Sequence, residues 1–96
     1  REIEMLEPFG PGNSEPVFGS KSLEVIDPRI VGNNHLKMKL RSRSQVMNAI
    51  GFDMGELYNI IESTSVVDAA YTATVNEWEG GKSLQLNLKA LRPANL

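Results

Sequence analysis

The sequence predicts an all-β domain, a small five-stranded barrel with one short helix between the third and fourth strands. Three observations support this. Apolar and polar residues alternate with period two over several stretches, and glycine-containing turns separate these stretches. Between the predicted third and fourth strands, the stretch around residues 57–61 has the three- and four-residue apolar spacing of a helix. A chain of 96 residues is expected to form one domain with a single core.

The strand expected at residues 35–43 is the most regular, because its residues alternate without interruption. One parity carries Leu36, Met38 and Leu40, so this side is expected to face the core. The other parity carries permanent cations, called the basic row below: Lys37, Lys39, Arg41 and Arg43. Cations on one face of a strand lie about 6.6 Å apart, which suits an extended polyanion such as single-stranded nucleic acid. The alternative is a solvated edge that keeps other chains from pairing.

The neighbouring strands are expected at residues 21–26, which end in a bend at Asp27-Pro28, and at residues 45–52. The cluster at residues 32–34 is a turn that leads into the basic strand as a hairpin. In the strand at 45–52 the apolar members are Val46, Ile50 and Phe52, and Phe52 is predicted to be core.

The helix is expected to start at Asp53 as N-cap, with Glu56 completing a capping box. Its apolar stripe lies on the core. The fourth strand is expected at residues 66–78, with Tyr71 and Val75 on its apolar face. A tight glycine turn leads to the last strand at residues 83–91, with Leu84, Leu86 and Leu88 inward.

Three strands, a helix and a two-strand hairpin are the layout of an OB-fold, a partly open Greek-key barrel. That fold binds oligonucleotides on its second and third strands and the flanking loops, and the basic row lies on the predicted second strand. Topology and charge therefore indicate the same surface. Strand count alone leaves SH3-like and other small barrels open.

Composition excludes several classes. There is no cysteine, hence no disulfide scaffold or thiolate metal site, and no apolar run approaches a membrane span. The net charge is only −2, but four of the ten Lys and Arg residues lie within residues 37–43, so the local field is expected to be positive.

An enzyme active site is not expected, because His35 is the only histidine and no catalytic or phosphate-loop motif is present. Trp78, next to the predicted hairpin turn, is a second candidate contact with nucleic acid. It would stack a base, cover the barrel mouth or dock on a neighbouring domain. The residues leave these alternatives open.

Residues 1–20 are expected to be a junction and residues 21–96 the OB domain. Residues 1–7 have the spacing of the last turns of a helix, and residues 8–16 hold three prolines and two glycines. The abrupt start suggests a piece of a longer protein. Residues 8–18, PFGPGNSEPVF, resemble the PFGxGNPxPxF junction of RecJ-type single-strand-specific exonucleases, with Ser14 where that family usually has Pro. Residues 31–37, 49–52, 76–78 and 83–86 match the same family in order.

The resemblance implies a single-stranded-DNA-binding module of a bacterial cytoplasmic 5′→3′ exonuclease of recombination and repair. In that family a DHH/DHHA1 catalytic core holds Mn²⁺ or Mg²⁺ and cleaves the DNA. Those motifs are absent here, so the fragment is expected to have no catalytic residue, no cofactor and no nuclease activity of its own. The implied contacts with DNA are the basic row and Trp78. The residues implied to fix the junction with the core are Phe9, Gly10, Gly12 and Asn13.

The alternative is a structural or protein-interaction OB module, in which the basic row meets an acidic partner or the parent's own core. A cationic surface continued by Arg29 or Lys89 would favour DNA, and an isolated flat patch would favour docking.

Overall fold

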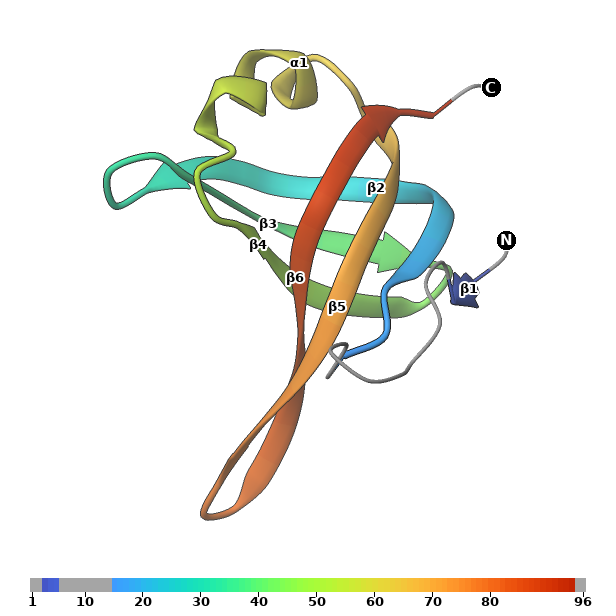
Figure 1. Cartoon of the computed structure of the whole chain (residues 1–96), viewed down its shortest axis with the longest axis vertical. Coiled ribbons are helices and arrows are strands. Elements are labelled where there is room, and N and C mark those ends of the chain that lie inside the picture. Colours follow the sequence, from blue (N-terminus) through green and yellow to red (C-terminus); the bar gives the residue numbers. More distant parts are fainter. Residues whose placement is uncertain (1–2, 6–14, 95–96) are drawn as a thin grey trace.

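The computed structural model describes residues 3–5 and 15–94. In chain order its elements are β1 (Ile3–Met5), β2 (Phe18–Val31), β3 (His35–Ser42), β4 (Gln45–Gly51), the 3-10 turn η1 (Gly55–Leu57), α1 (Tyr58–Glu62), β5 (Val66–Trp78) and β6 (Gly81–Pro93) (Figure 1). Strands β2 to β6 correspond to the five predicted strands. The short helix lies between the third and fourth of them, as predicted.

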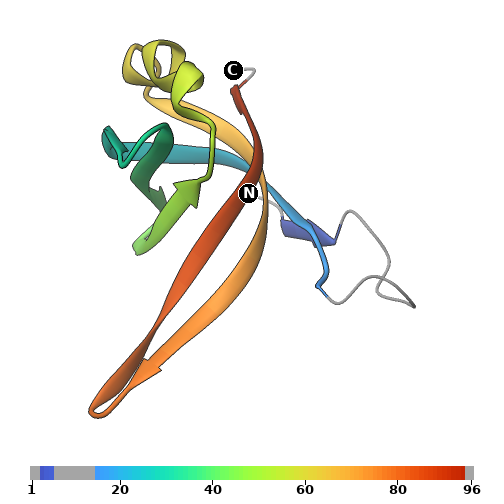
Figure 2. The same cartoon turned by 60° about the vertical axis from the view of Figure 1, so that its left-hand side comes forward.

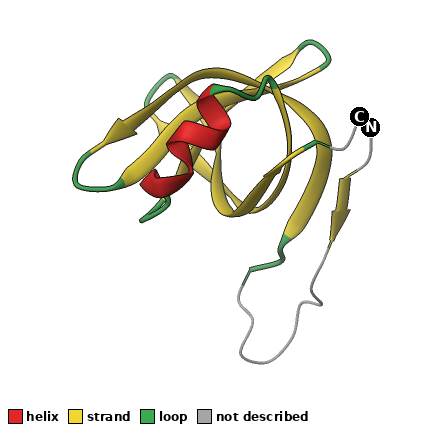
Figure 3. Cartoon of the chain, turned by 90° about the horizontal axis from the view of Figure 1, so that it is seen from above, coloured by secondary structure: helices red, strands yellow, loops and turns green. Residues whose placement is uncertain are grey.

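Pairing closes these strands into a barrel in the order β2-β3-β4-β6-β5, with β5 returning to β2. All neighbours are antiparallel except β4 and β6, which run parallel. Viewed from above, the strands form a ring and the helix lies across one side of it (Figure 3). This arrangement confirms the predicted OB-fold.

Strand β1 is an addition to the barrel, and it corrects the helix expected at residues 1–7. Ile3 pairs with Ser20 and Met5 with Phe18 at the outer edge of β2. The first three residues of β2, 18–20, come from the segment predicted as junction. The proline- and glycine-rich part of that junction lies outside the described residues.

Strand β2 is much longer than predicted because it bends and serves two neighbours. Its first half pairs with β5 and its second half with β3. Register shifts fall between Ser20 and Leu23 and between Ile26 and Arg29, with positive φ angles at Ser22 (60°) and Asp27 (55°). Bulges of this kind bend a strand and increase its twist, which closes the barrel. The bend expected at Asp27-Pro28 is thus confirmed.

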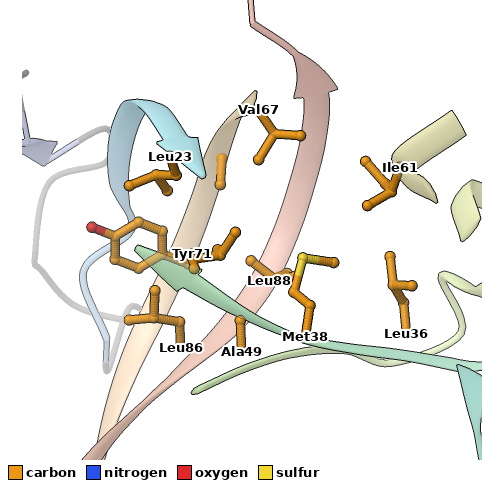
Figure 4. Close-up of a cluster of buried hydrophobic side chains, with 11 residues drawn as sticks. Leu23, Leu36, Met38, Ala49, Ile61, Val67, Tyr71, Leu86 and Leu88 are labelled. Carbon is orange, nitrogen blue, oxygen red and sulfur yellow. The ribbon is translucent and has the colours of Figure 1, made fainter. Parts of the chain in front are cut away.

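The core lies inside the barrel, and one side of β3 provides much of it. Leu36, Met38 and Leu40 are all at most 1% exposed, as the alternation predicted. Figure 4 shows Leu36 at one end of the cluster, facing Ile61 of α1. At the seam between β2 and β5, the hydroxyls of Ser20 and Tyr71 are hydrogen-bonded at 2.6 Å.

Strands β5 and β6 continue past the barrel as a two-stranded hairpin (Figures 1 and 2). Val75 and Leu84 are paired there on the side that is apolar in the barrel, but they are 53% and 36% exposed. The predicted inward position of Leu84 is therefore wrong, and Val75 is exposed although it lies on the predicted apolar face. The reason is that the hairpin extends beyond the strands that would cover both residues.

The helix start also differs from its prediction. Asp53 has a positive φ of 59° and lies in the turn before η1, whose N-cap is Met54 without a side-chain hydrogen bond. The capping box does not form, because the Asp53 N–H donates to the ring of His35 instead.

Truncating an inward side chain of the β3–β4 hairpin is expected to lower stability much more than truncating an outward one. Leu40→Ala leaves a cavity in the core and is expected to lower the free energy of unfolding by about 2–5 kcal/mol. Val46→Ala, on the outer face of β4, is expected to cost less than about 1 kcal/mol. Urea unfolding of both variants measures this, and equal losses would contradict the assigned faces.

Candidate nucleic-acid interface

The outer face of β3 presents the strand part of the basic row. Lys39 and Arg41 are exposed and Lys37 is partly buried, while the residues between them face the core. Arg43 differs from its prediction: it lies in the turn after β3 with a positive φ of 60°. The row on the strand therefore has three cations, and Arg43 follows it at the hairpin turn.

Neighbouring acids neutralise part of this charge. Arg41 is paired across the sheet with Glu24 of β2, donating from Nε at 2.8 Å to the carboxylate Oε1. Lys37 and Lys39 form no ion pair with any residue that the structure describes. The two lysines are therefore the cations of β3 that remain free to meet a ligand.

The two residues named as a possible continuation of the basic row are Arg29 and Lys89. Arg29 of β2 lies opposite Lys37 in the register of the two strands. Its guanidinium is held by the Asp27 carboxylate at 2.8 Å. Lys89 lies on β6, two residues beyond Asn87 on the same parity.

Strand β4 presents an unexpected row of side chains beside these cations. Its register with β3 pairs Leu36 with Gly51, Met38 with Ala49 and Leu40 with Met47. Residues directly opposite in a sheet share a face, so the alternate positions of β4 point outward. These positions are called the β4 row: Val46, Asn48 and Ile50, followed on the same parity by Phe52.

Phe52 was predicted to be core, and this is wrong: it is 58% exposed. Its ring contacts that of His35 in an edge arrangement, with centroids 5.2 Å apart and planes at 73°. The Asp53 N–H donates to Nδ1 of His35 at 3.0 Å. These contacts join the start of β3 to the end of β4.

The turn at residues 32–34 is tied to the same place. The Gly55 N–H donates to the Asn34 carbonyl at 3.1 Å, and any Cβ at position 55 would collide with the Asn34 side chain. Glycine is therefore required where the two loops meet. The loop that flanks the basic row is fixed by backbone contacts.

A polar ladder continues the outer face beyond β4. Asn48 is in register with Gln85 and Ile50 with Asn87 on β6. Gln85 donates to Asn87 at 3.2 Å, and Asn87 donates to Thr74 of β5 at 2.7 Å. These bonds give the sheet next to the β4 row a fixed, uncharged surface.

The structure does not bring Trp78 to the basic row. It is the last residue of β5, 56% exposed, at the tip of the hairpin that projects from the barrel (Figures 1 and 2). Its indole lies over Gly81, where a Cβ would approach Cζ2 to 3.1 Å. The predicted junction residues Phe9, Gly10, Gly12 and Asn13 lie outside the described residues.

Residues 3–5 and 15–94 contain no group of three or more His, Cys, Asp or Glu side chains that would hold a metal ion. None of the helices in these residues is long and apolar enough to cross a membrane.

A closed five-stranded barrel with one short helix between its third and fourth strands defines the class of OB-fold domains. The sequence matches the family described as the RecJ OB domain over residues 1–90, and the chain belongs to that family.

Three relatives, each a single-stranded-DNA-specific exonuclease RecJ, are similar to most of the chain. The Bacillus subtilis protein is 34% identical over 92% of the chain, the Dickeya dadantii protein 31% over 90%, and the Haemophilus influenzae protein 30% over 95%. The aligned parts are 12%, 15% and 16% of those proteins, so the chain spans a small part of their length.

The Glu24–Arg41 ion pair predicts a gain of function. Glu24→Gln removes the carboxylate that holds Arg41, so binding to a single-stranded oligonucleotide at low salt is expected to strengthen. The slope of log K against log salt is expected to steepen by about 0.7, the value of one phosphate contact. The pair is exposed, so stability is expected to change by at most about 1 kcal/mol. Fluorescence anisotropy measures the affinity, and weaker binding of the variant would contradict the assignment.

Proposed function

We propose that this chain is the single-stranded-DNA-holding module of a RecJ-type 5′→3′ exonuclease, and that a DHH/DHHA1 core elsewhere in the parent protein cleaves the strand. The observation that carries the proposal is the pair of free cations, Lys37 and Lys39, on the outer face of the second barrel strand. Oligonucleotides bind OB-folds on this face. Membership of the RecJ OB family supports the same substrate, as does the naming of the relatives as single-stranded-DNA-specific exonucleases.

The lysines would hold phosphate oxygens by charge, because an ammonium is a compact donor without a preferred base. Their spacing is fixed by the strand, and Leu36, Met38 and Leu40 anchor that strand in the core. Binding would therefore tolerate any sequence and weaken with salt. Tethering the strand in this way raises the local concentration of DNA at the linked core.

Hydrolysis itself would belong to the parent's core, with Mn²⁺ or Mg²⁺ held there. This chain would hold the DNA, and the reacting groups would come from that core. The relatives come from bacteria, and we propose the bacterial cytoplasm as the place of action.

A docking role is the second candidate, and the projecting hairpin favours it. The exposed pair of Val75 and Leu84 extends the apolar side of β5 and β6 beyond the barrel. Such a pair is suited to an apolar surface of the parent's core. It lies apart from the basic row along the chain, so the two roles are compatible in one domain.

The test is a salt titration of a double variant, Lys37→Gln with Lys39→Gln. Loss of two phosphate contacts is expected to flatten the slope of log K against log salt by about 1.4, because each contact on a single strand contributes about 0.7. Binding of a labelled oligothymidylate is followed by fluorescence anisotropy, and circular dichroism verifies the fold.

The matched control is Lys21→Gln with Lys82→Gln. It changes the net charge by the same amount as the β3 variant, but at positions on β2 and in the β5–β6 hairpin. This control is expected to keep most of the wild-type slope. If the control loses the slope and the β3 variant keeps it, the DNA contacts another surface. If the folded wild type does not bind at low salt, the docking role takes precedence.

A further inference from the structure

Core packing does not explain the position of Phe52. A large aromatic side chain usually stabilises a protein by leaving water, yet 58% of Phe52 remains exposed on the outer side of the sheet. It follows Gly51, the last residue of β4, on the outward parity, and Gly51 pairs with Leu36 of β3. The next position across the hairpin is His35, whose ring it contacts.

His35 is held from three directions, so it forms a fixed support for Phe52. Its Nδ1 accepts the Asp53 N–H at 3.0 Å, which places the proton of the neutral ring on Nε2. The backbone of Gly32 lies against the imidazole edge, since a Cβ there would be 3.1 Å from Cδ2. Phe52 lies on the remaining side with its centroid 5.2 Å away. A platform fixed before binding loses little entropy when a ligand arrives.

Phe52 and its support His35, together called the platform, lie at the end of two adjacent rows of outward side chains. The rows follow β3 and β4 and differ in chemistry. On β3 the next outward residue is Lys37, and on β4 it is Ile50, which is paired with Lys37 in the register. Charge thus follows one strand, and its neighbour carries two apolar side chains, Val46 and Ile50, on either side of the uncharged Asn48. Single-stranded DNA has the same division, with phosphates along one edge and flat base faces along the other.

We propose that Phe52 stacks a nucleobase of bound single-stranded DNA, with His35 as its positioning residue, and that bases lie along the β4 row while phosphates lie on Lys37 and Lys39. This inference rests on the proposed function and adds to it the orientation of the strand across the sheet. It also assigns the stacking role to Phe52 and not to Trp78, which is at the distant tip of β5.

The test compares two ligands on two proteins. The ligands are an oligothymidylate of about 12 nucleotides and a strand of equal length whose sugars carry no bases. The variant Phe52→Leu stays apolar but loses the aromatic face. Its affinity for the oligothymidylate is expected to fall roughly 5- to 100-fold, the range for loss of one stacked base. Its affinity for the base-free strand and its salt slope are expected to stay at the wild-type values.

Two controls separate stacking from a structural effect. Phe52→Trp is expected to restore binding of the oligothymidylate, because indole also offers a stacking face. Ile60→Leu changes another exposed apolar residue, 49% exposed on α1, and is expected to bind both ligands like wild type. Equal losses on both ligands for Phe52→Leu would overturn the inference, because the base-free strand has nothing to stack.

The outcome also distinguishes this inference from the proposed function. Suppose that the variant of Lys37 and Lys39 loses salt dependence but Phe52→Leu binds like wild type. The proposed DNA-holding function then stands, and the stacking role of Phe52 is overturned. If Phe52→Leu fails to fold, Phe52→Trp in a Trp78→Phe background serves instead. Its single indole reports on position 52, and quenching by the oligothymidylate but not by the base-free strand supports stacking. Absence of quenching at saturation overturns it.

Discussion

The pairing register between β3 and β4 is the constraint on which the rest of the surface depends. Leu36, Met38 and Leu40 are nearly inaccessible to solvent, so β3 cannot slip by one residue without placing lysines in the core. The same register sets Gly51, Ala49 and Met47 opposite these residues. Core packing therefore determines which side chains of both strands face outward.

That constraint explains how a chain of net charge −2 presents a cationic surface. Strand alternation places Lys37 and Lys39 on one face, while two acids of β2 reduce the positive charge at selected points. Glu24 holds Arg41 and Asp27 holds Arg29. Among the described residues of β3, Lys37 and Lys39 are the cations without an ion pair, and they lie opposite Ile50 and Asn48 of β4. Local arrangement, and not total charge, determines where the field is positive.

The fold was predictable because its strong signals are local. Unbroken alternation on β3, the glycine turns and a single helical stripe suffice for five strands, one helix and their order. The faces of β4 were not predictable from its own residues, because Val46 and Ile50 are branched apolar residues and yet point outward. The signal was the small pair of Ala49 and Gly51, which fit opposite Met38 and Leu36 inside a narrow barrel. That signal has meaning only once the register is known.

Other differences have the same cause, since pairing partners lie far apart in sequence. The ion pair of Arg41 is with Glu24, 17 residues earlier in the chain, and the residues next to Arg41 do not predict it. The hairpin ends of β5 and β6 are exposed because these two strands are longer than the neighbouring strand β4. The sequence around Asp53 is typical of a helix N-cap. Its backbone N–H instead donates a hydrogen bond to His35, 18 residues earlier.

The central claim is that the outer face of β3 and β4 binds single-stranded DNA. It is tested most directly by a two-dimensional nitrogen–proton NMR titration of the labelled domain with an oligothymidylate. We expect the largest shift changes along Lys37, Lys39 and Ile50 and in the turn at residues 52–53, with little change in α1 or β1. Shift changes confined to the β5–β6 hairpin, or none at saturating oligonucleotide, would contradict the account.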